Sequence, residues 1–317
     1  MNIVVLDAAT LGEDLSLEPL KNIGECKVYQ STSPEDVAER IANCDVVVLN
    51  KIKLNSSNLP YAKNLKLICL AATGYDNVDI SYCTEHGIGV CNVEGYSSHS
   101  VSQLTIAMVL SLSTHLSEYN RFVTSGDYTR SGLANRLVPV YNELCGKKWG
   151  IVGFGGIGRE VGRVAEALGC ELLVCKRHPV EGYNCVDIDT LCREADIITI
   201  HTPLTDSTKH LIDNTRLHLM KKSVILVNAA RGLVTDENAV AEAVKNGAIG
   251  AFGTDVYSVE PFGKEHPFFE IKDYPNVCLT PHMAWGAFEA RRRCLDEIVC
   301  NIREYFAGGS RNRVDLI

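Results

Sequence analysis

Short apolar runs that alternate with stretches of helical spacing constrain the fold of this 317-residue chain more than any other feature. The runs are rich in Val, Ile and Leu, and an uninterrupted apolar run is typical of a strand buried on both faces of a parallel sheet. Strands that alternate with helices predict βαβ units and an α/β fold. The expected strands are Ile3–Leu6, Val46–Leu49, Leu67–Leu70, Gly150–Val152, Glu171–Cys175, Ile197–Ile200 and Val224–Val227.

A weak internal repeat predicts that the chain holds two similar halves. Residues 44–48 (CDVVV) resemble residues 195–199 (ADIIT), and residues 66–74 (KLICLAATG) resemble residues 223–232 (SVILVNAARG). Each segment reads as a strand, or a strand that enters a glycine-containing loop. The length also suffices for two domains that each bury a core. Two open α/β domains would present their ligand crevices at the carboxyl ends of these strands.

The link between the halves predicts how the domains are divided. Apolar residues at helical spacing from His99 to Phe122 predict a long bridging helix, followed by a polar, irregular arm from Thr124 to Leu137. A helix over residues 287–306 predicts a second crossing, which makes the first domain discontinuous. The predicted domains are 1–98 with 288–317, and 99–287.

Composition narrows the classes of partner. The formal net charge of −8 argues against a nucleic-acid partner. The 13 cysteines are scattered and include no CxxC pair, which predicts free thiols in a reducing compartment and no metal site. The N-terminal apolar run stops at Asp7 without a basic leader, and no run reaches the ~20 residues of a membrane helix. We therefore expect a cytoplasmic protein that does not bind membranes.

A glycine-rich run follows the strand that ends at Val152 and precedes a helical pattern. Residues 153–158 read GFGGIG, which is a GxGxxG motif. In this setting the first glycine permits a tight turn, the second lets a pyrophosphate approach the backbone, and the third lets helix and strand pack closely. A bare GxGxxG can also be an ordinary turn. The residues predicted to hold a dinucleotide here are Gly153, Gly155, Gly156, Ile157 and Gly158.

The next strand bears on the choice between NAD and NADP. NAD sites usually place an acid about 20 residues after the motif, where it binds the ribose 2′-hydroxyl. Here the strand ends at Cys175 and is followed by Lys176, Arg177 and His178. Lys176 and Arg177 can bind a 2′-phosphate through charge-assisted hydrogen bonds, so NADP is favoured over NAD. The alternative is a solvated basic turn.

Three segments of the C-terminal half each follow an expected strand and carry one side chain suited to 2-keto acid reduction. They are residues 228–232 (NAARG), 255–261 (DVYSVEP) and 280–282 (TPH). The planar guanidinium of Arg231 can hold a carboxylate or polarise a carbonyl. His282 can exchange a proton with the substrate oxygen, and Glu260 can orient its ring. Taken singly, these residues also fit a surface salt bridge, a packed histidine and a solvated acid.

These motifs, with residues 72–79 (ATGYDNVD) and 201–204 (HTPL), resemble the D-isomer-specific 2-hydroxyacid dehydrogenase family over nearly the whole chain. The resemblance implies an NAD(P)-dependent oxidoreductase with a flavodoxin-like substrate domain, a dinucleotide-binding domain and a cleft between them. It implies that Arg231, Glu260 and His282 are the catalytic trio. It also implies a homodimer joined through the cofactor domain and its arm. The backbone amides of Thr73, Gly74 and Tyr75 would hold the substrate carboxylate, and Thr202, Pro203, Ala230 and Asp255 would line the cofactor, with Asp255 at the nicotinamide amide.

Residues 282–285 (HMAW) most resemble the glycerate dehydrogenase or hydroxypyruvate reductase branch, which implies hydroxypyruvate or glyoxylate as the small-molecule substrate. Two alternatives stay open. One is a reductase for bulkier 2-keto acids such as phenylpyruvate. The other is a non-catalytic dinucleotide sensor that resembles the corepressors of this fold.

Overall fold

The computed structural model describes residues 1–316, which form two compact units. Unit 1 consists of Met1–Ser97 and Trp285–Ile317, and unit 2 is Ser98–Ala284. The chain therefore leaves unit 1 at residue 97 and returns to it at residue 285, whereas the predicted domain limits were 98 and 288. No helix in residues 1–316 is both long and apolar enough to span a membrane.

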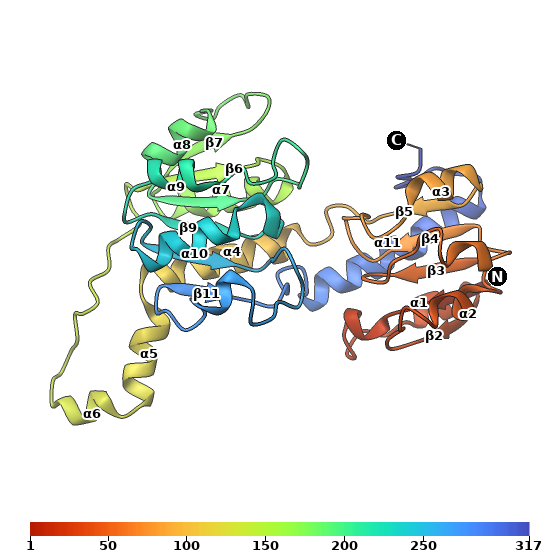
Figure 1. The fold of residues 1–317 in the computed structure, drawn as a ribbon, viewed down its shortest axis with the longest axis horizontal. Helices are drawn as coiled ribbons and strands as arrows, with labels where there is room; N and C mark the ends of the chain where they lie inside the picture. Colours follow the sequence, from red (N-terminus) through yellow and green to blue (C-terminus); the bar gives the residue numbers. More distant parts are fainter. Residues whose placement is uncertain (317) are drawn as a thin grey trace. The chain divides into compact units, whose positions relative to one another are not determined.

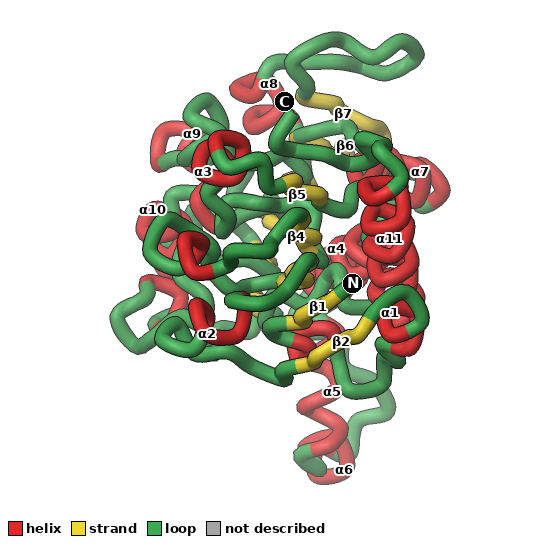
Figure 2. The backbone as a smooth tube through the Cα atoms, turned by 90° about the vertical axis from the view of Figure 1, so that its right-hand side faces the viewer, coloured by secondary structure: helices red, strands yellow, loops and turns green. Residues whose placement is uncertain are grey.

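Unit 1 is built on a five-stranded parallel sheet in the order β2-β1-β3-β4-β5. Helices α1 and α11 pack on one face, and α2 and α3 cover the other (Figure 2). The central strands β3 and β4 are buried at every residue, as their uninterrupted apolar runs predict. The elements are β1 (Asn2–Val5), η1 (Ala8–Leu11), α1 (Glu18–Lys21), β2 (Glu25–Val28), α2 (Val37–Ile41), β3 (Val46–Leu49), η2 (Leu59–Tyr61), β4 (Leu67–Leu70), α3 (Ile80–Glu85), β5 (Gly89–Cys91) and α11 (Phe288–Phe306).

Unit 2 is built on a six-stranded parallel sheet in the order β11-β10-β9-β8-β6-β7 (Figure 1). Helices α4 and α7 pack on one face, and α8, α9 and α10 pack on the other. The elements are α4 (Ser98–Ser113), α5 (Leu116–Thr124), α6 (Asp127–Ser131), β6 (Lys148–Val152), α7 (Gly156–Ala167), β7 (Glu171–Cys175), α8 (Ile188–Glu194), β8 (Ile197–Ile200), α9 (Asn214–Leu219), β9 (Ile225–Asn228), η3 (Gly232–Val234), α10 (Glu237–Lys245), β10 (Ala251–Thr254), η4 (Pro267–Phe269) and β11 (Val277–Leu279).

The two sheets share one topology, in which the second strand lies at an edge and the first, third, fourth and fifth follow in order. The repeated segments occupy equivalent neighbouring strands, since β3 pairs with β4 and β8 pairs with β9. The predicted α/β architecture of two parallel sheets is thus confirmed. Strand order reverses between β6 and β8 in unit 2, and open α/β sheets bind ligands at such a switch point.

Three details differ from the sequence prediction. The expected helix from His99 to Phe122 is two helices, because His115 adopts a left-handed φ of 52° between α4 and α5. The expected irregular arm contains the short helix α6. Strands β2, β5, β10 and β11 were not among the strands predicted with bounds; β2 and β11 are only partly buried, and β5 and β11 have three residues each.

Candidate active site

All six strands of the unit 2 sheet end next to a predicted site segment. The strands are parallel, so their carboxyl ends lie along one edge of the sheet. In sheet order from β7 to β11, this edge carries the basic turn, the glycine loop, the 201–203 segment and the three segments of the trio. Residues that are far apart in sequence are therefore delivered to one edge of one unit.

The glycine loop has the geometry that a dinucleotide requires. Gly153 has a φ of +89°, and a Cβ atom there would lie 2.7 Å from the backbone carbonyl of His201. A Cβ atom at Gly158 would lie 2.2 Å from the oxygen of Gly153, so only glycine lets α7 pack this closely. A Cβ atom at Gly155 would meet no atom within 4 Å, which leaves room for a phosphate beside the helix N-terminus. The residues present therefore fit a nicotinamide dinucleotide.

The basic turn after β7 is exposed. Lys176 reaches the carbonyl oxygen of Phe154 at 3.5 Å, so it lies beside the glycine loop. Arg159, in the first turns of α7, places its guanidinium carbon 4.9 Å from the centre of the Phe154 ring. Arg159 was not named by the sequence interpretation, because the motif ends at Gly158. Lys176 and Arg159 thus flank Phe154 beside the loop that would hold the cofactor phosphates.

His201, directly after β8, is a half-buried residue next to this loop, and both of its ring nitrogens are inaccessible to solvent. Burial lowers its pKa to about 3, so the ring is neutral at pH 7. Neither ring nitrogen has a hydrogen-bond partner in residues 1–316. Thr202 and Pro203 follow it, and the Thr202 nitrogen lies 2.8 Å from the position of a Cβ on Gly153. The 201–203 segment therefore adjoins the glycine loop.

His282 and Glu260 form a direct pair. The Nδ1 atom of His282 lies 2.5 Å from Oε2 of Glu260, and both side chains remain partly exposed. The sequence interpretation placed these residues on separate loops, and the structure brings them together. His282 also has a left-handed φ of 52°, a conformation that costs a residue other than glycine roughly 1–2 kcal/mol. Such strain is concentrated at functional sites.

Asp255 holds the turn that carries His282. Its buried carboxylate accepts hydrogen bonds from Thr280 Oγ1 at 2.7 Å and from the backbone nitrogens of Met283 and Ala284 at 2.8 Å. Burial raises the pKa of the Asp255 carboxyl, and these hydrogen bonds oppose that rise. The contacts reveal a positioning role that the resemblance did not supply. Its predicted contact with the nicotinamide amide stays a prediction.

Arg231 follows β9 with its guanidinium largely uncommitted. Nη1 donates to the carbonyl oxygen of Ala230 at 2.8 Å, and no carboxylate in residues 1–316 forms an ion pair with it. The backbone is held by the side chain of Asn228, which donates to the Arg231 oxygen at 2.9 Å. A half-buried cation without an anionic partner is suited to an anionic ligand.

The predicted substrate residues Thr73, Gly74 and Tyr75 lie in unit 1, after β4. The Thr73 hydroxyl donates to the oxygen of Val93 at 2.8 Å, and the side chain of Asn92 donates to the Thr73 oxygen at 2.8 Å. Within the part of the chain that the structure describes, the backbone amides of residues 73–75 donate no hydrogen bond. A fixed loop with free N–H groups fits the binding of a carboxylate.

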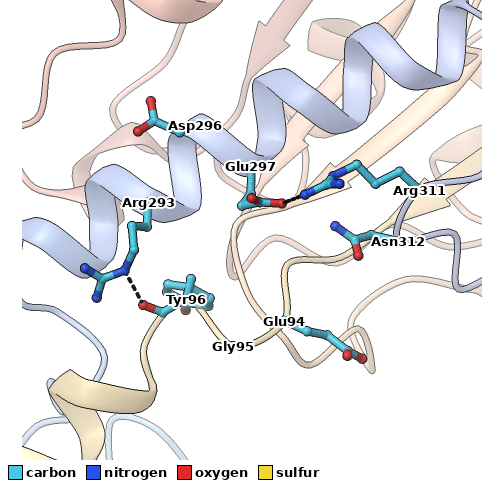
Figure 3. Close-up of a pocket in the computed structure, with 8 residues that line it drawn as sticks. All are labelled: Glu94, Gly95, Tyr96, Arg293, Asp296, Glu297, Arg311 and Asn312. Atoms are coloured by element: carbon cyan, nitrogen blue, oxygen red, sulfur yellow. Dashed lines mark hydrogen bonds and ion pairs between the residues drawn. The ribbon is translucent and has the colours of Figure 1, made fainter. Parts of the chain in front are cut away.

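Unit 1 also contains a polar hollow of about 530 Å³ between α11 and the loop after β5 (Figure 3). Within it, Arg311 forms an ion pair with Glu297 at 2.6 Å, and Arg293 donates to the carbonyl oxygen of Tyr96 at 3.0 Å. None of the predicted site residues lines it. The lining residues are Glu94, Gly95, Tyr96, Arg293, Asp296, Glu297, Arg311 and Asn312.

Comparison with known proteins agrees with this arrangement. The sequence profile of the D-isomer specific 2-hydroxyacid dehydrogenase NAD binding domain matches residues 106–284. The chain is 35% identical to a glycerate dehydrogenase of Methylorubrum extorquens over 99% of this chain and 98% of that protein. It is 34% identical to a hydroxypyruvate reductase of Blautia hydrogenotrophica over 99% of this chain and 100% of that protein.

Among solved structures, a D-lactate dehydrogenase from Aquifex aeolicus in complex with NAD and lactic acid superposes with a TM-score of 0.87. The identity is 26%, and the match covers 99% of each chain. The residues matched by the profile include the glycine loop and all three segments of the trio. The chain therefore belongs to the D-isomer-specific 2-hydroxyacid dehydrogenases, which are oxidoreductases that act on a CH–OH group with NAD(P).

Proposed function

We propose that the chain reduces a small 2-keto acid, hydroxypyruvate or glyoxylate, to the D-2-hydroxy acid. The observation that carries this proposal is the 2.5 Å contact between His282 and Glu260, at the sheet edge that also presents the glycine loop. The names of the similar glycerate dehydrogenase and hydroxypyruvate reductase support the substrate class. The test is oxidation of NAD(P)H by a panel of 2-keto acids, set out at the end of the Discussion.

The trio divides the chemistry into binding and proton transfer. Bound NAD(P)H supplies the hydride. Arg231 binds the substrate and polarises its 2-keto oxygen through the two-pronged guanidinium. With Nδ1–H donated to Glu260, the other ring nitrogen of His282 is left to exchange a proton with the 2-keto oxygen. The free amides of residues 73–75 bind the substrate carboxylate.

We infer that the cofactor is NADP rather than NAD. No acid follows β7, whereas Lys176 and Arg177 stand there and Arg159 lies close by. Replacing Lys176 and Arg177 together with glutamine is expected to raise the Kd of NADPH about 10- to 100-fold, because charge-assisted hydrogen bonds to the 2′-phosphate are lost. The Kd of NADH, which has no such phosphate, should change less than about threefold.

Fluorescence titration with each cofactor measures these constants. Lys222→Gln is the matched control and should leave both constants unchanged. Lys222 is exposed and precedes the amino end of β9, whereas the basic turn follows the carboxyl end of β7. Equal losses for NADPH and NADH would mean that the basic turn is only solvated surface.

We infer that two copies associate through the arm that contains α5 and α6. Neither helix buries a residue within the chain, and both extend away from the sheet of unit 2 (Figure 1). The segment after α6 exposes apolar side chains, among them Leu137 at 74% and Val140 at 73%. Contiguous exposed apolar residues of this kind mark association surfaces.

Sedimentation equilibrium is expected to give a particle of twice the 34.7 kDa chain mass. Leu137→Asp combined with Val140→Asp should shift the protein to monomer, because two charges would be buried in the interface. Tyr61→Asp, which alters an exposed aromatic residue of unit 1, is the control and should leave the dimer intact. A wild-type protein that sediments as a monomer would refute the inference.

A further inference from the structure

Tyr257, in the loop after β10 of unit 2, contacts the segment of every member of the trio. The Tyr257 amide donates to Oε1 of Glu260 at 3.0 Å. The Tyr257 hydroxyl donates to the oxygen of Thr280 at 2.8 Å, the same oxygen that accepts from the His282 amide. A Cβ atom at Gly232 would lie 2.2 Å from the Tyr257 carbonyl carbon, so the residue after Arg231 rests directly on the peptide between Tyr257 and Ser258.

The peptide is itself held by Glu237, the first residue of α10. The amide of Ser258 donates to Oε1 of Glu237 at 2.8 Å, and the Ser258 hydroxyl donates to Oε2. The Glu237 side chain is 7% exposed, although a glutamate in the first turn of a helix is normally solvated. Asp236 already caps α10 by accepting from the Ala239 amide. Glu237 is therefore not needed to begin the helix.

His266 completes the surroundings of this carboxylate. Its Nδ1 accepts from the amide of Phe268 at 3.2 Å, which leaves the ring proton on Nε2. Nε2 lies 3.0 Å from Oε2 of Glu237, although the N–H is not well aligned with that oxygen. Burying a carboxylate is costly unless its oxygens find donors, and here both oxygens do. The two Ser258 donors belong to the loop that carries Glu260.

We propose that Glu237 is a positioning residue for 2-keto acid reduction. Its buried carboxylate holds the Tyr257–Ser258 peptide and so fixes Tyr257, whose own amide keeps Glu260 in contact with His282. The Glu237 carboxylate accepts its hydrogen bonds from Ser258, so Glu237 acts through this loop. The inference rests on the proposed function, because the reaction is what Glu260 and His282 are positioned to perform.

Glu237→Gln tests the proposal, since glutamine keeps the size of the side chain but offers one oxygen to the two donors of Ser258. We expect kcat to fall about 10- to 100-fold, as small displacements of reacting groups do, with the Kd of NAD(P)H unchanged. In a His282→Ala background, Glu237→Gln should lower kcat by less than about twofold further. The effects of two residues that act through one another are not additive. A general structural defect would instead multiply with the loss at His282.

Two further variants make the outcome decisive. Glu242→Gln, on the exposed face of α10, is the matched control and should keep wild-type kcat. Ser258→Ala leaves the buried carboxylate in place and removes one of its hydrogen bonds, so it should reduce kcat severalfold even if Glu237→Gln folds poorly. Unchanged kcat in both Glu237→Gln and Ser258→Ala would overturn the proposal, and so would losses that multiply with His282→Ala.

Amide hydrogen exchange separates this proposal from the proposed function, because it needs no turnover. The amides of residues 257–260 should exchange faster in Glu237→Gln than in the wild type, with those of β9 and β10 unaffected. If the wild type reduced no 2-keto acid but this exchange still increased, the proposed function would fail while the hold on the loop stood. Unchanged exchange in an active enzyme would refute the positioning role alone.

Discussion

His282→Ala is expected to lower kcat for 2-keto acid reduction by about 10²- to 10⁴-fold, the usual contribution of a positioned acid–base group. Alanine leaves Glu260 without its ring partner and leaves no group at this position to supply the proton that the 2-keto oxygen needs. The Kd of NAD(P)H should stay within about twofold, since the glycine loop and basic turn are untouched. Steady-state kinetics and cofactor fluorescence measure the two quantities on one preparation.

The control for this change is His218→Ala. His218 is an exposed histidine of α9 whose Nδ1 contacts the oxygen of Asn214 on the same helix, so its loss should leave kcat unaltered. His282→Gly adds a test of the strained backbone, because glycine adopts a positive φ without steric cost. This variant should be as inactive as His282→Ala. Its free energy of unfolding in urea should exceed that of His282→Ala by roughly 1 kcal/mol. Near-wild-type kcat in either His282 variant would remove the residue from the mechanism.

Arg231→Lys should reduce kcat/KM by about 10²- to 10³-fold, the range found when a donor to developing charge is removed. Charge is conserved in this variant, but the two-pronged donor is not, and a lysine ammonium cannot reproduce its geometry. The Arg231 guanidinium has no carboxylate partner in residues 1–316, so the loss should appear in catalysis and hardly in stability. Thermal unfolding and initial rates against substrate concentration distinguish the two.

Arg193→Lys provides the comparison. Arg193 is an exposed arginine in the last turn of α8 and belongs to none of the predicted site segments. It should keep both kcat/KM and stability. If Arg231→Lys also retained kcat/KM within about threefold, the substrate would have to be bound and polarised by other groups.

The α/β fold was predictable because uninterrupted apolar runs in the sequence indicate buried parallel strands. Strands β3, β4, β7 and β8 have the predicted bounds, and β3 and β4 are the uninterrupted apolar runs typical of strands inside a parallel sheet. The break between α4 and α5 was not predictable, because apolar residues continue at helical spacing through His115. Only the left-handed φ of that residue reveals the break.

The sequence identified the proposed members of the site but not the contacts between them. The segments that follow β9, β10 and β11 pointed to Arg231, Glu260 and His282, because parallel strands end at one edge. The role of Glu237 was not visible, since its partner Ser258 is 21 residues away and no local pattern marks a buried helix-terminal glutamate. The same holds for Asp255, whose carboxylate contacts a turn that begins 25 residues later.

The central claim is that this chain reduces a small 2-keto acid, and the most direct test is the oxidation of NADPH and NADH followed at ~340 nm with hydroxypyruvate, glyoxylate, pyruvate and phenylpyruvate. We predict rapid turnover of hydroxypyruvate or glyoxylate, faster with NADPH, and its loss in His282→Ala. Fast reduction of phenylpyruvate alone would move the substrate to the bulkier 2-keto acids. No oxidation with any of the four acids, from folded protein that binds the cofactor, would contradict the account and favour a dinucleotide sensor.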